Sequence, residues 1–394
     1  MYKVIFLLFF VLQNSYASVL DFYHNALHTL KLDKEQIYLN KTKNLKISAL
    51  KNDRFFNILF STSFNKRKDK YLSKPFNKTY FNIQDEIDIF NTNKNKIKLI
   101  FLSVKSKDIK LDIQKRALFI SLIKMIGAYQ KTKAILNLYK QILKNQVLLE
   151  KSLQQSVKAG NKSKLEYIKF ANDVVLLQYK IQKTENILNT MKSTLSLYSP
   201  KIPKLSFVQL NANLSQFLKY DPILKLNKNE AKKYMIKAIS LKKSWLPKMF
   251  VGMQKEYNND PTGNGDSYTF TVGLKMHFYG GINKSVQAAD MEALSINSQY
   301  NRLLIQQKME YIKYYNQYKT SRKSLSLLNS AVMSAQNNLT ALKTAYMKHY
   351  ITLTNYLQAL NLLTNTKILY INAKFNNITS ALILNDLSTG IIYK

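Results

Sequence analysis

The amino-acid sequence predicts an α+β membrane protein with two structural repeats in one chain. Three observations support this class. Residues 267–278 alternate strictly between apolar and polar side chains, four long stretches almost lack glycine and proline, and both halves present their elements in the same order. Alternation with a period of two predicts a strand with one apolar face, and unbroken stretches of this length predict long helices that pack side by side.

Composition excludes several functions. The chain of 394 residues has no cysteine, which excludes disulfides, thiolate metal sites and cysteine nucleophiles. It has 60 lysines and arginines against 23 acidic residues, a formal net charge of +37, but only five arginines. Because nucleic-acid surfaces commonly recruit arginine for bidentate contacts, we predict no nucleic-acid partner and expect the charge to affect solute selectivity.

Residues 1–17 predict a secretory signal peptide. Lys3 precedes nine consecutive apolar residues at 4–12, and the small residues Ser15 and Ala17 stand at positions −3 and −1 of a cleavage site. We therefore expect the mature chain to begin at Ser18. No later apolar run approaches the length of a membrane-spanning helix, so the exported chain is expected to be periplasmic, extracellular or inserted as a β-barrel.

The strongest strand signal lies in the second half, at 267–278. Residues 249–257 are its predicted partner, and the turn-rich segment 258–266 joins the two strands. One face of the strand is expected to meet lipid, and it carries Tyr268, Phe270, Val272, Leu274 and Met276. The other face is expected to line a lumen, and it carries Thr269, Thr271, Lys275 and His277.

A weaker strand pair is predicted in the first half, at 56–61 and 81–89, joined by a lysine-rich solvent loop at roughly 65–79. Asp85 falls on the otherwise apolar face of the second of these strands. The same alternation also fits a soluble sheet with one wet face, so that alternative stays open.

Four strands cannot close a transmembrane barrel, because such barrels start at about eight strands. Two chains would give eight strands, and the side chains of so small a barrel fill its interior. Three chains would give twelve strands and an open lumen. We therefore predict a trimeric 12-stranded transmembrane β-barrel with four strands from each chain.

Two pairs of long helices follow the predicted strand pairs. They are expected at 107–155, 165–197, 284–348 and 352–387. Helices of this length need lateral partners along their whole extent, as in a coiled-coil barrel or bundle. Pro200, Pro203 and Pro222 mark a linker between the two halves, and the first repeat is expected at 18–204 and the second at 205–394.

This organisation resembles the TolC-type outer-membrane efflux proteins. The resemblance rests on Trp245-Leu246-Pro247-Lys248 before the third strand, Phe278-Tyr279-Gly280-Gly281 after the fourth, and Thr352-Leu353-Thr354-Asn355-Tyr356-Leu357-Gln358-Ala359-Leu360 at the start of the last long helix. The same place in the first repeat holds Gly160-Asn161-Lys162-Ser163-Lys164-Leu165-Glu166-Tyr167, and a shift of 189 residues aligns Gly160 with His349 and Ser163 with Thr352.

The resemblance implies a homotrimer in the outer membrane of a Gram-negative bacterium. Its β-barrel would contact outer-membrane lipid, and a long α-helical barrel would continue into the periplasm. A periplasmic adaptor protein and an inner-membrane transporter of RND or ABC type would be its partners. The assembly would act as a passive export conduit gated at its periplasmic helical tip.

The resemblance also assigns residues to this tip. Relatives carry two acids one helical turn apart in the returning helix, and the matching residues here are the neutral Asn355 and Gln358, while Ile351 replaces a gate-locking arginine. The expected tip and gate residues are Lys162, Glu166, Lys169, Tyr346, His349, Ile351, Asn355 and Gln358. The expected adaptor contacts are Gly160, Ser163, Thr352 and Leu353.

The sequence predicts no enzyme, cofactor or metal site. His24 and His28 are one helical turn apart, but two histidines without further nearby ligands are too few for a protein metal site. The alternative to an export channel is a soluble periplasmic coiled-coil adaptor or scaffold without a pore. The twelve-residue alternation at 267–278 favours the channel.

Overall fold

The computed structural model describes residues 19–52, 59–67, 76–87, 90, 92–258, 266–276 and 280–393. The predicted signal peptide at 1–17 and the predicted lumen residue His277 lie outside these ranges. The chain forms two compact units. The first comprises 1–33, 112–221 and 305–394, and the second comprises 34–111 and 222–304.

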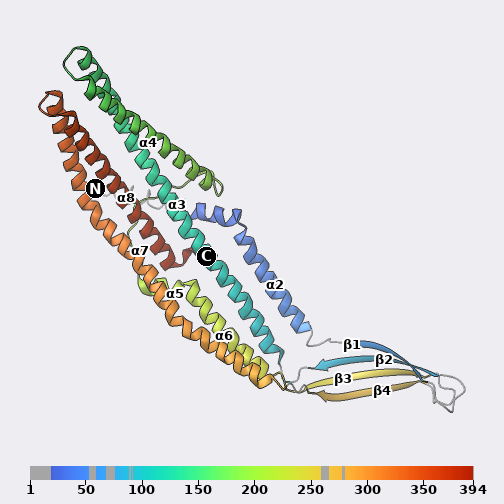
Figure 1. The fold of residues 1–394 in the computed structure, drawn as a ribbon. Helices are drawn as coiled ribbons and strands as arrows, with labels where there is room; N and C mark the ends of the chain where they lie inside the picture. Colours follow the sequence, from blue (N-terminus) through green and yellow to red (C-terminus); the bar gives the residue numbers. More distant parts are fainter. Residues whose placement is uncertain are drawn as a thin grey trace, which may run out of the picture. The chain divides into compact units, whose positions relative to one another are not determined.

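Helices make up most of the described chain (Figure 1). A helix at 19–29 precedes α2 (Leu32–Asn52), α3 (Asn93–Lys158), α4 (Lys164–Ser196), α5 (Leu214–Tyr220), α6 (Pro222–Lys242), α7 (Ile282–Met347), α8 (Leu353–Thr389) and the 3₁₀ turn η1 (Ile391–Tyr393). The four predicted long helices are confirmed, although α3 begins at Asn93, earlier than expected. Among these described helices, we find none with an apolar stretch long enough to cross a bilayer.

The two long helical hairpins match each other in the length of their first helices and in the positions at which their helices begin. Both α3 and α7 contain 66 residues, and their first residues, Asn93 and Ile282, are separated by the 189-residue shift of the sequence alignment. The same shift separates Lys164 and Leu353, where α4 and α8 begin. These equal offsets support two repeats, while the boundary between residues 204 and 205 stays a prediction.

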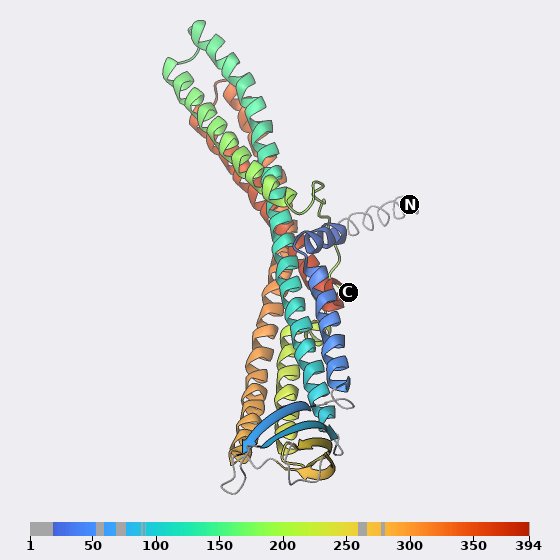
Figure 2. The same cartoon turned by 90° about the vertical axis from the view of Figure 1, so that its right-hand side faces the viewer.

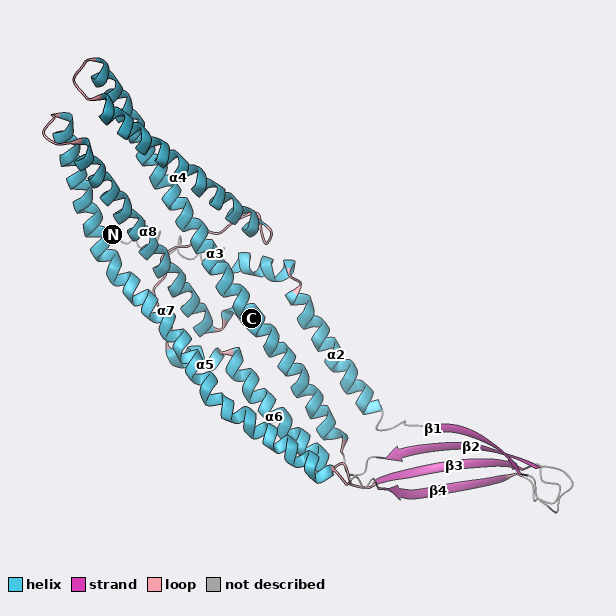
Figure 3. Cartoon of the chain, in the orientation of Figure 1, coloured by secondary structure: helices cyan, strands magenta, loops and turns pink. Residues whose placement is uncertain are grey.

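The strands form one antiparallel sheet in the order β1-β2-β3-β4 (Figure 3). The strands are β1 (Leu59–Arg67), β2 (Phe76–Ile87), β3 (Lys248–Asn258) and β4 (Ser267–Lys275). The expected solvent loop at 65–79 is wrong at both ends, because the β1–β2 ladder extends to the pair Arg67 and Phe76. Backbone groups can pair whatever the side chains are, so lysine-rich ends still join a ladder.

The strand register separates an apolar face from a polar face. Val272 lies opposite Val251, and Phe270 lies opposite Met253, which in turn lies opposite Ile83. Cross-strand partners share one face of a sheet, so these side chains form a continuous apolar surface. Asp85 lies opposite Val251 and therefore falls on the apolar face, as the sequence predicted.

The main core of the first unit gathers helices that are far apart in sequence. Its largest fully buried side chains include Phe22, Phe119, Phe217 and Leu382, from the 19–29 helix, α3, α5 and α8. Within this unit, the turns that end α3 and α7 lie at the same end of the two hairpins (Figure 2). The core thus holds together the hairpins that carry both predicted tip segments.

Candidate functional site

The turns at the tips of the two hairpins are of the same type. The N–H of Asn161 donates to the carbonyl of Ser156 at 2.9 Å, and the N–H of Tyr350 donates to that of Ala345 at the same distance. Gly160 and His349 occupy the left-handed residue of these turns, with φ of +76° and +65°. This hydrogen-bond pattern is a Schellman motif, for which glycine is the favoured left-handed residue.

Each returning helix is capped by a side chain from the turn. Ser163 Oγ accepts a hydrogen bond from the Leu165 N–H at 3.1 Å, and Thr352 Oγ1 accepts one from the Asn355 N–H at 3.4 Å. Both caps have extended backbones, as N-cap residues do. Ser163 and Thr352, two predicted adaptor contacts, therefore also have a structural role in the turns.

A small apolar core lies directly behind the two turns. It joins Phe170 of α4 to Tyr346 of α7 and to Leu353 and Tyr356 of α8. The rings of Tyr346 and Tyr356 are stacked, with centroids 5.7 Å apart and an interplanar angle of 19°. The tip core therefore links the two hairpins side by side.

Lys162 connects the first turn to this core. Its Nζ lies 4.4 Å from the centroid of the Tyr346 ring and 3.9 Å from Oε2 of Glu166. Burial, with smaller contributions from Glu166 and Tyr356, raises the pKa of Tyr346 to about 12. Under the 189-residue shift, Lys162 is the counterpart of Ile351. The first repeat therefore places a cation in the tip at the position where the second repeat has none.

The other predicted tip residues divide into exposed and buried sets. Asn355 and Gln358 are exposed and lie three residues apart, on one side of α8. Lys169, His349, Gly160, Ser163 and Thr352 are also exposed, and Ile351 is half-buried against the tip core. Leu353 differs from the expectation of an adaptor contact, because its side chain is 3% exposed and packs in the tip core.

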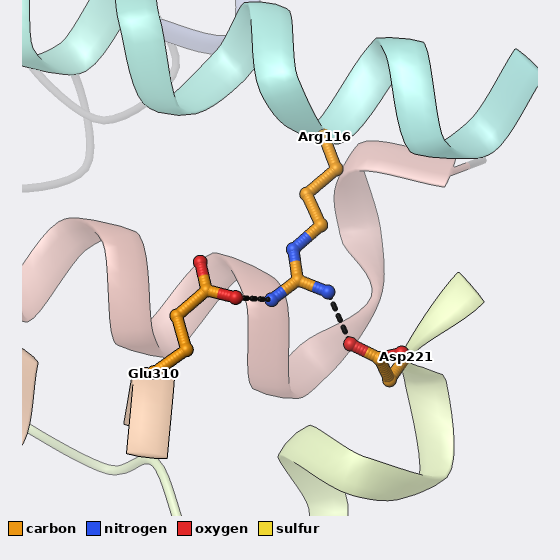
Figure 4. A network of polar contacts seen from close by, with 3 residues as sticks. All are labelled: Arg116, Asp221 and Glu310. Carbon is orange, nitrogen blue, oxygen red and sulfur yellow. Dashed lines mark hydrogen bonds and ion pairs between the residues drawn. The ribbon is translucent and has the colours of Figure 1, made fainter. Parts of the chain in front are cut away.

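A buried ion network lies in the main core of the first unit (Figure 4). Arg116 of α3 donates to Asp221, which follows α5, and to Oε2 of Glu310 in α7 at 2.8 Å. Burial acts to lower the pKa of Arg116, but these two carboxylates outweigh it and the pKa is raised. The charges compensate one another within the chain, which indicates a structural role. Sequence analysis missed this network because its members are far apart in sequence.

The sheet has its own polar contacts. Glu86 of β2 pairs with Lys248 of β3 and with Lys275 of β4, each at 2.9 Å. Lys275 thus shares one face of the sheet with Glu86, and its position toward a lumen stays a prediction. On the opposite face of β4, Phe270 and Val272 are 75% and 70% exposed in the single chain. These exposed apolar side chains are grouped on one face instead of scattered singly over the surface. The edge strands β1 and β4 are also open, because each has a neighbour on one side only.

Comparisons with solved structures place the fold. Neither a protein-family model nor a curated protein matches the sequence. The outer-membrane protein VceC of Vibrio cholerae is 12% identical, with a TM-score of 0.78 over 94% of this chain and 96% of that one. The outer-membrane channel OprN is 11% identical, with a TM-score of 0.79 over 95% and 90%. The CmeC outer-membrane channel of Campylobacter jejuni is 13% identical, with a TM-score of 0.75 over 94% and 85%.

These matches define the class of fold. The chain has the fold of outer-membrane channel proteins along nearly its whole length, as its resemblance to TolC-type proteins predicted. The proteins that share the fold are described as membrane proteins and channels, and none of those compared above is described as an enzyme.

Proposed function

We propose that this protein is an outer-membrane export channel of a Gram-negative bacterium and extends into the periplasm. The observation that carries the proposal is a channel fold over 94% of the chain, combined with a sheet that has one mainly apolar face, on which Asp85 and Lys255 are the charged exceptions in β2 and β3. The conduit is passive. It receives solutes from a periplasmic adaptor and an inner-membrane transporter of RND or ABC type.

The proposed assembly is a homotrimer with a twelve-stranded barrel. In the order β1-β2-β3-β4, the two edge strands run in opposite directions, so β4 of one copy can pair antiparallel with β1 of the next. Closure would remove both open edges, which otherwise favour uncontrolled association. The apolar face, including Val272, would meet lipid, and the polar face, including Thr271, would line the lumen.

The proposed gate is the helical tip. Asn355 and Gln358 would line the periplasmic mouth, and Gly160, Ser163 and Thr352 would contact the adaptor. Lys162 of the first hairpin contacts the ring of Tyr346 in the second. This contact favours a tip in which the two hairpins of one chain move together. Amides and lysines in place of acids favour a mouth that is weakly cation-selective at most, or anion-selective.

The test is insertion and conductance of the purified full chain. Cell fractionation should recover it with the outer membrane as an oligomer whose gel migration changes on heating. Planar bilayers should then display discrete single-channel currents. A protein that stays in the soluble periplasmic fraction and gives no currents would instead support the adaptor or scaffold alternative.

A further inference from the structure

A groove in the second unit lies outside both the tip and the strand faces. It has a volume of roughly 410 Å³ and is formed by α2, α3 and α6. Its lining combines the apolar side chains of Ile47, Phe101 and Ile236, called here the floor, with Lys98, Lys105 and Lys232, called here the rim. Phe101 is 49% exposed, which is high for a phenylalanine, because this residue type is more often buried.

The rim of the groove is positively charged and not neutralised by the chain. No ion pair joins Lys98, Lys105 or Lys232 to an acid within the ranges that the structure describes. Glu230, the acid of α6 nearest in sequence to the rim, pairs instead with Lys233. Lys43 of α2 adds a further cation, with its Nζ 6.0 Å from the centroid of the Phe101 ring. The groove therefore combines an apolar floor with unpaired positive charge.

The surrounding helices are strongly basic as a group. Segments 34–52, 93–111 and 222–242 together hold seventeen lysines and three acids. All three helices adjoin the sheet in this unit: α2 leads to β1, α3 follows β2, and α6 leads to β3 (Figure 1). Phe101 is in the first three turns of α3, so the groove is on the part of that helix that adjoins the strands.

We propose that this groove binds an anionic phospholipid of the outer membrane, with its phosphate among Lys98, Lys105 and Lys232 and part of an acyl chain on Phe101. The proposal rests on the proposed function, because it requires the sheet to lie in the membrane. Clustered lysines at a membrane surface attract anionic lipid headgroups. The groove also falls within the usual size range of small-molecule sites, which are mainly apolar with a few polar groups.

A second copy of the chain is the competing occupant, and the charges disfavour it. An occupant must present apolar and negatively charged groups together, and the whole chain carries only 23 acids against 60 cations. The three helices that form the groove also belong to one unit of one chain, so the groove is complete without a neighbour. A lipid supplies both the apolar and the anionic group in one molecule.

The test is lipid retention by the purified full-chain oligomer, measured by native mass spectrometry in non-ionic detergent. The probes are phosphatidylglycerol and phosphatidylcholine with the same acyl chains, together with inorganic phosphate. The wild type should retain phosphatidylglycerol in preference to phosphatidylcholine and should not retain phosphate alone. The double variant Lys98→Glu with Lys105→Glu should lower phosphatidylglycerol affinity about tenfold or more, and Phe101→Ala should weaken both lipids.

The matched control is Lys96→Glu with Lys107→Glu. These two exposed lysines are on the opposite side of the same stretch of α3, so the change of charge is identical but lies away from the groove. The control should keep wild-type lipid preference. Equal losses in the two double variants, equal retention of both lipids, or no lipid on a wild type that conducts current would overturn the lipid site. A wild type without current would overturn the channel proposal instead.

Discussion

Arg116 is a residue at which a single substitution should strongly destabilise the first unit. Its guanidinium is bound by Asp221, whose side chain is fully buried, and by Glu310. Arg116→Met removes the cation and leaves two carboxylates without it, which should lower the free energy of unfolding by about 3–5 kcal/mol. Chemical denaturation measures this loss. Arg302→Met is the control, because Arg302 is exposed and its substitution should change stability by no more than about 0.5 kcal/mol.

Tyr346 allows a pH test of the tip. Its folded pKa is raised to about 12, mainly by burial, so the folded state keeps the phenol neutral where the unfolded chain ionises. This contribution to stability is complete below about pH 10, the ordinary tyrosine pKa, and is lost between about pH 10 and 12.

The Tyr346→Phe variant should lack that alkaline loss. Its buried hydroxyl has no hydrogen-bond partner within the described residues, so removing it should leave stability at pH 7 unchanged or higher. Unfolding midpoints of wild type and variant, measured from pH 7 to 12, compare the two. If the unfolding midpoints of both proteins fall equally between pH 10 and 12, Tyr346 makes no such contribution.

At the scale of elements, the two turns give a matched experiment. Both use a left-handed residue, but the first has Gly160 and the second has His349. Gly160→His should destabilise the first turn and His349→Gly should stabilise the second, each by about 1 kcal/mol or less, because the entropy that glycine adds to the unfolded chain offsets part of the left-handed strain in both cases. Hydrogen exchange at the amides of Asn161 and Tyr350 reports each turn. Lys158→His, at a helical position beside the first turn, should have little effect.

The strand β4 offers a test of which face meets lipid. Val272 and Thr271 are neighbours on opposite faces, opposite Val251 and Gly252 of β3. Val272→Arg should cost about 2–4 kcal/mol at mid-membrane depth and lower the amount of assembled channel, while Thr271→Arg should assemble normally. Heat-modifiable gel migration of membrane fractions measures assembly. Equal tolerance at both positions would favour a soluble sheet.

The same elements indicate how far sequence reasoning reaches. Long helices, the tip turns and most of the strand predicted at 267–278, which ends at Lys275, were predictable, because periodicity and the 189-residue repeat are local or regular signals. The extension of β1 to Arg67 was not predictable, because backbone groups form the strand pairs there and the side chains give no apolar alternation to mark the strand. The burial of Leu353 and the Arg116 network depend on contacts between distant segments, with sequence separations of 105 and 194 residues in the network. No local pattern encodes such contacts.

At the scale of the whole molecule, symmetry would multiply each tip residue by three. Asn355 and Gln358 of three copies would place six amides around the periplasmic mouth, where acidic rings would otherwise bind cations. Charge that lines a narrow opening sets its ion preference. The wild-type channel should therefore not be blocked with high affinity by a trivalent cation added on the periplasmic side.

The double variant Asn355→Asp with Gln358→Asp should create that block, because six carboxylates would replace six amides. Single-channel current in planar bilayers, titrated with the trivalent cation, gives the blocking affinity. Asn365→Asp with Asn376→Asp adds the same charge at exposed sites further along α8 and should create no comparable block. If the control blocks equally, the total charge of α8 rather than a ring at the mouth controls cation binding. High-affinity block of the wild type would place the cation site on other residues, with Glu166, the acid in the first turn of α4, as the first candidate.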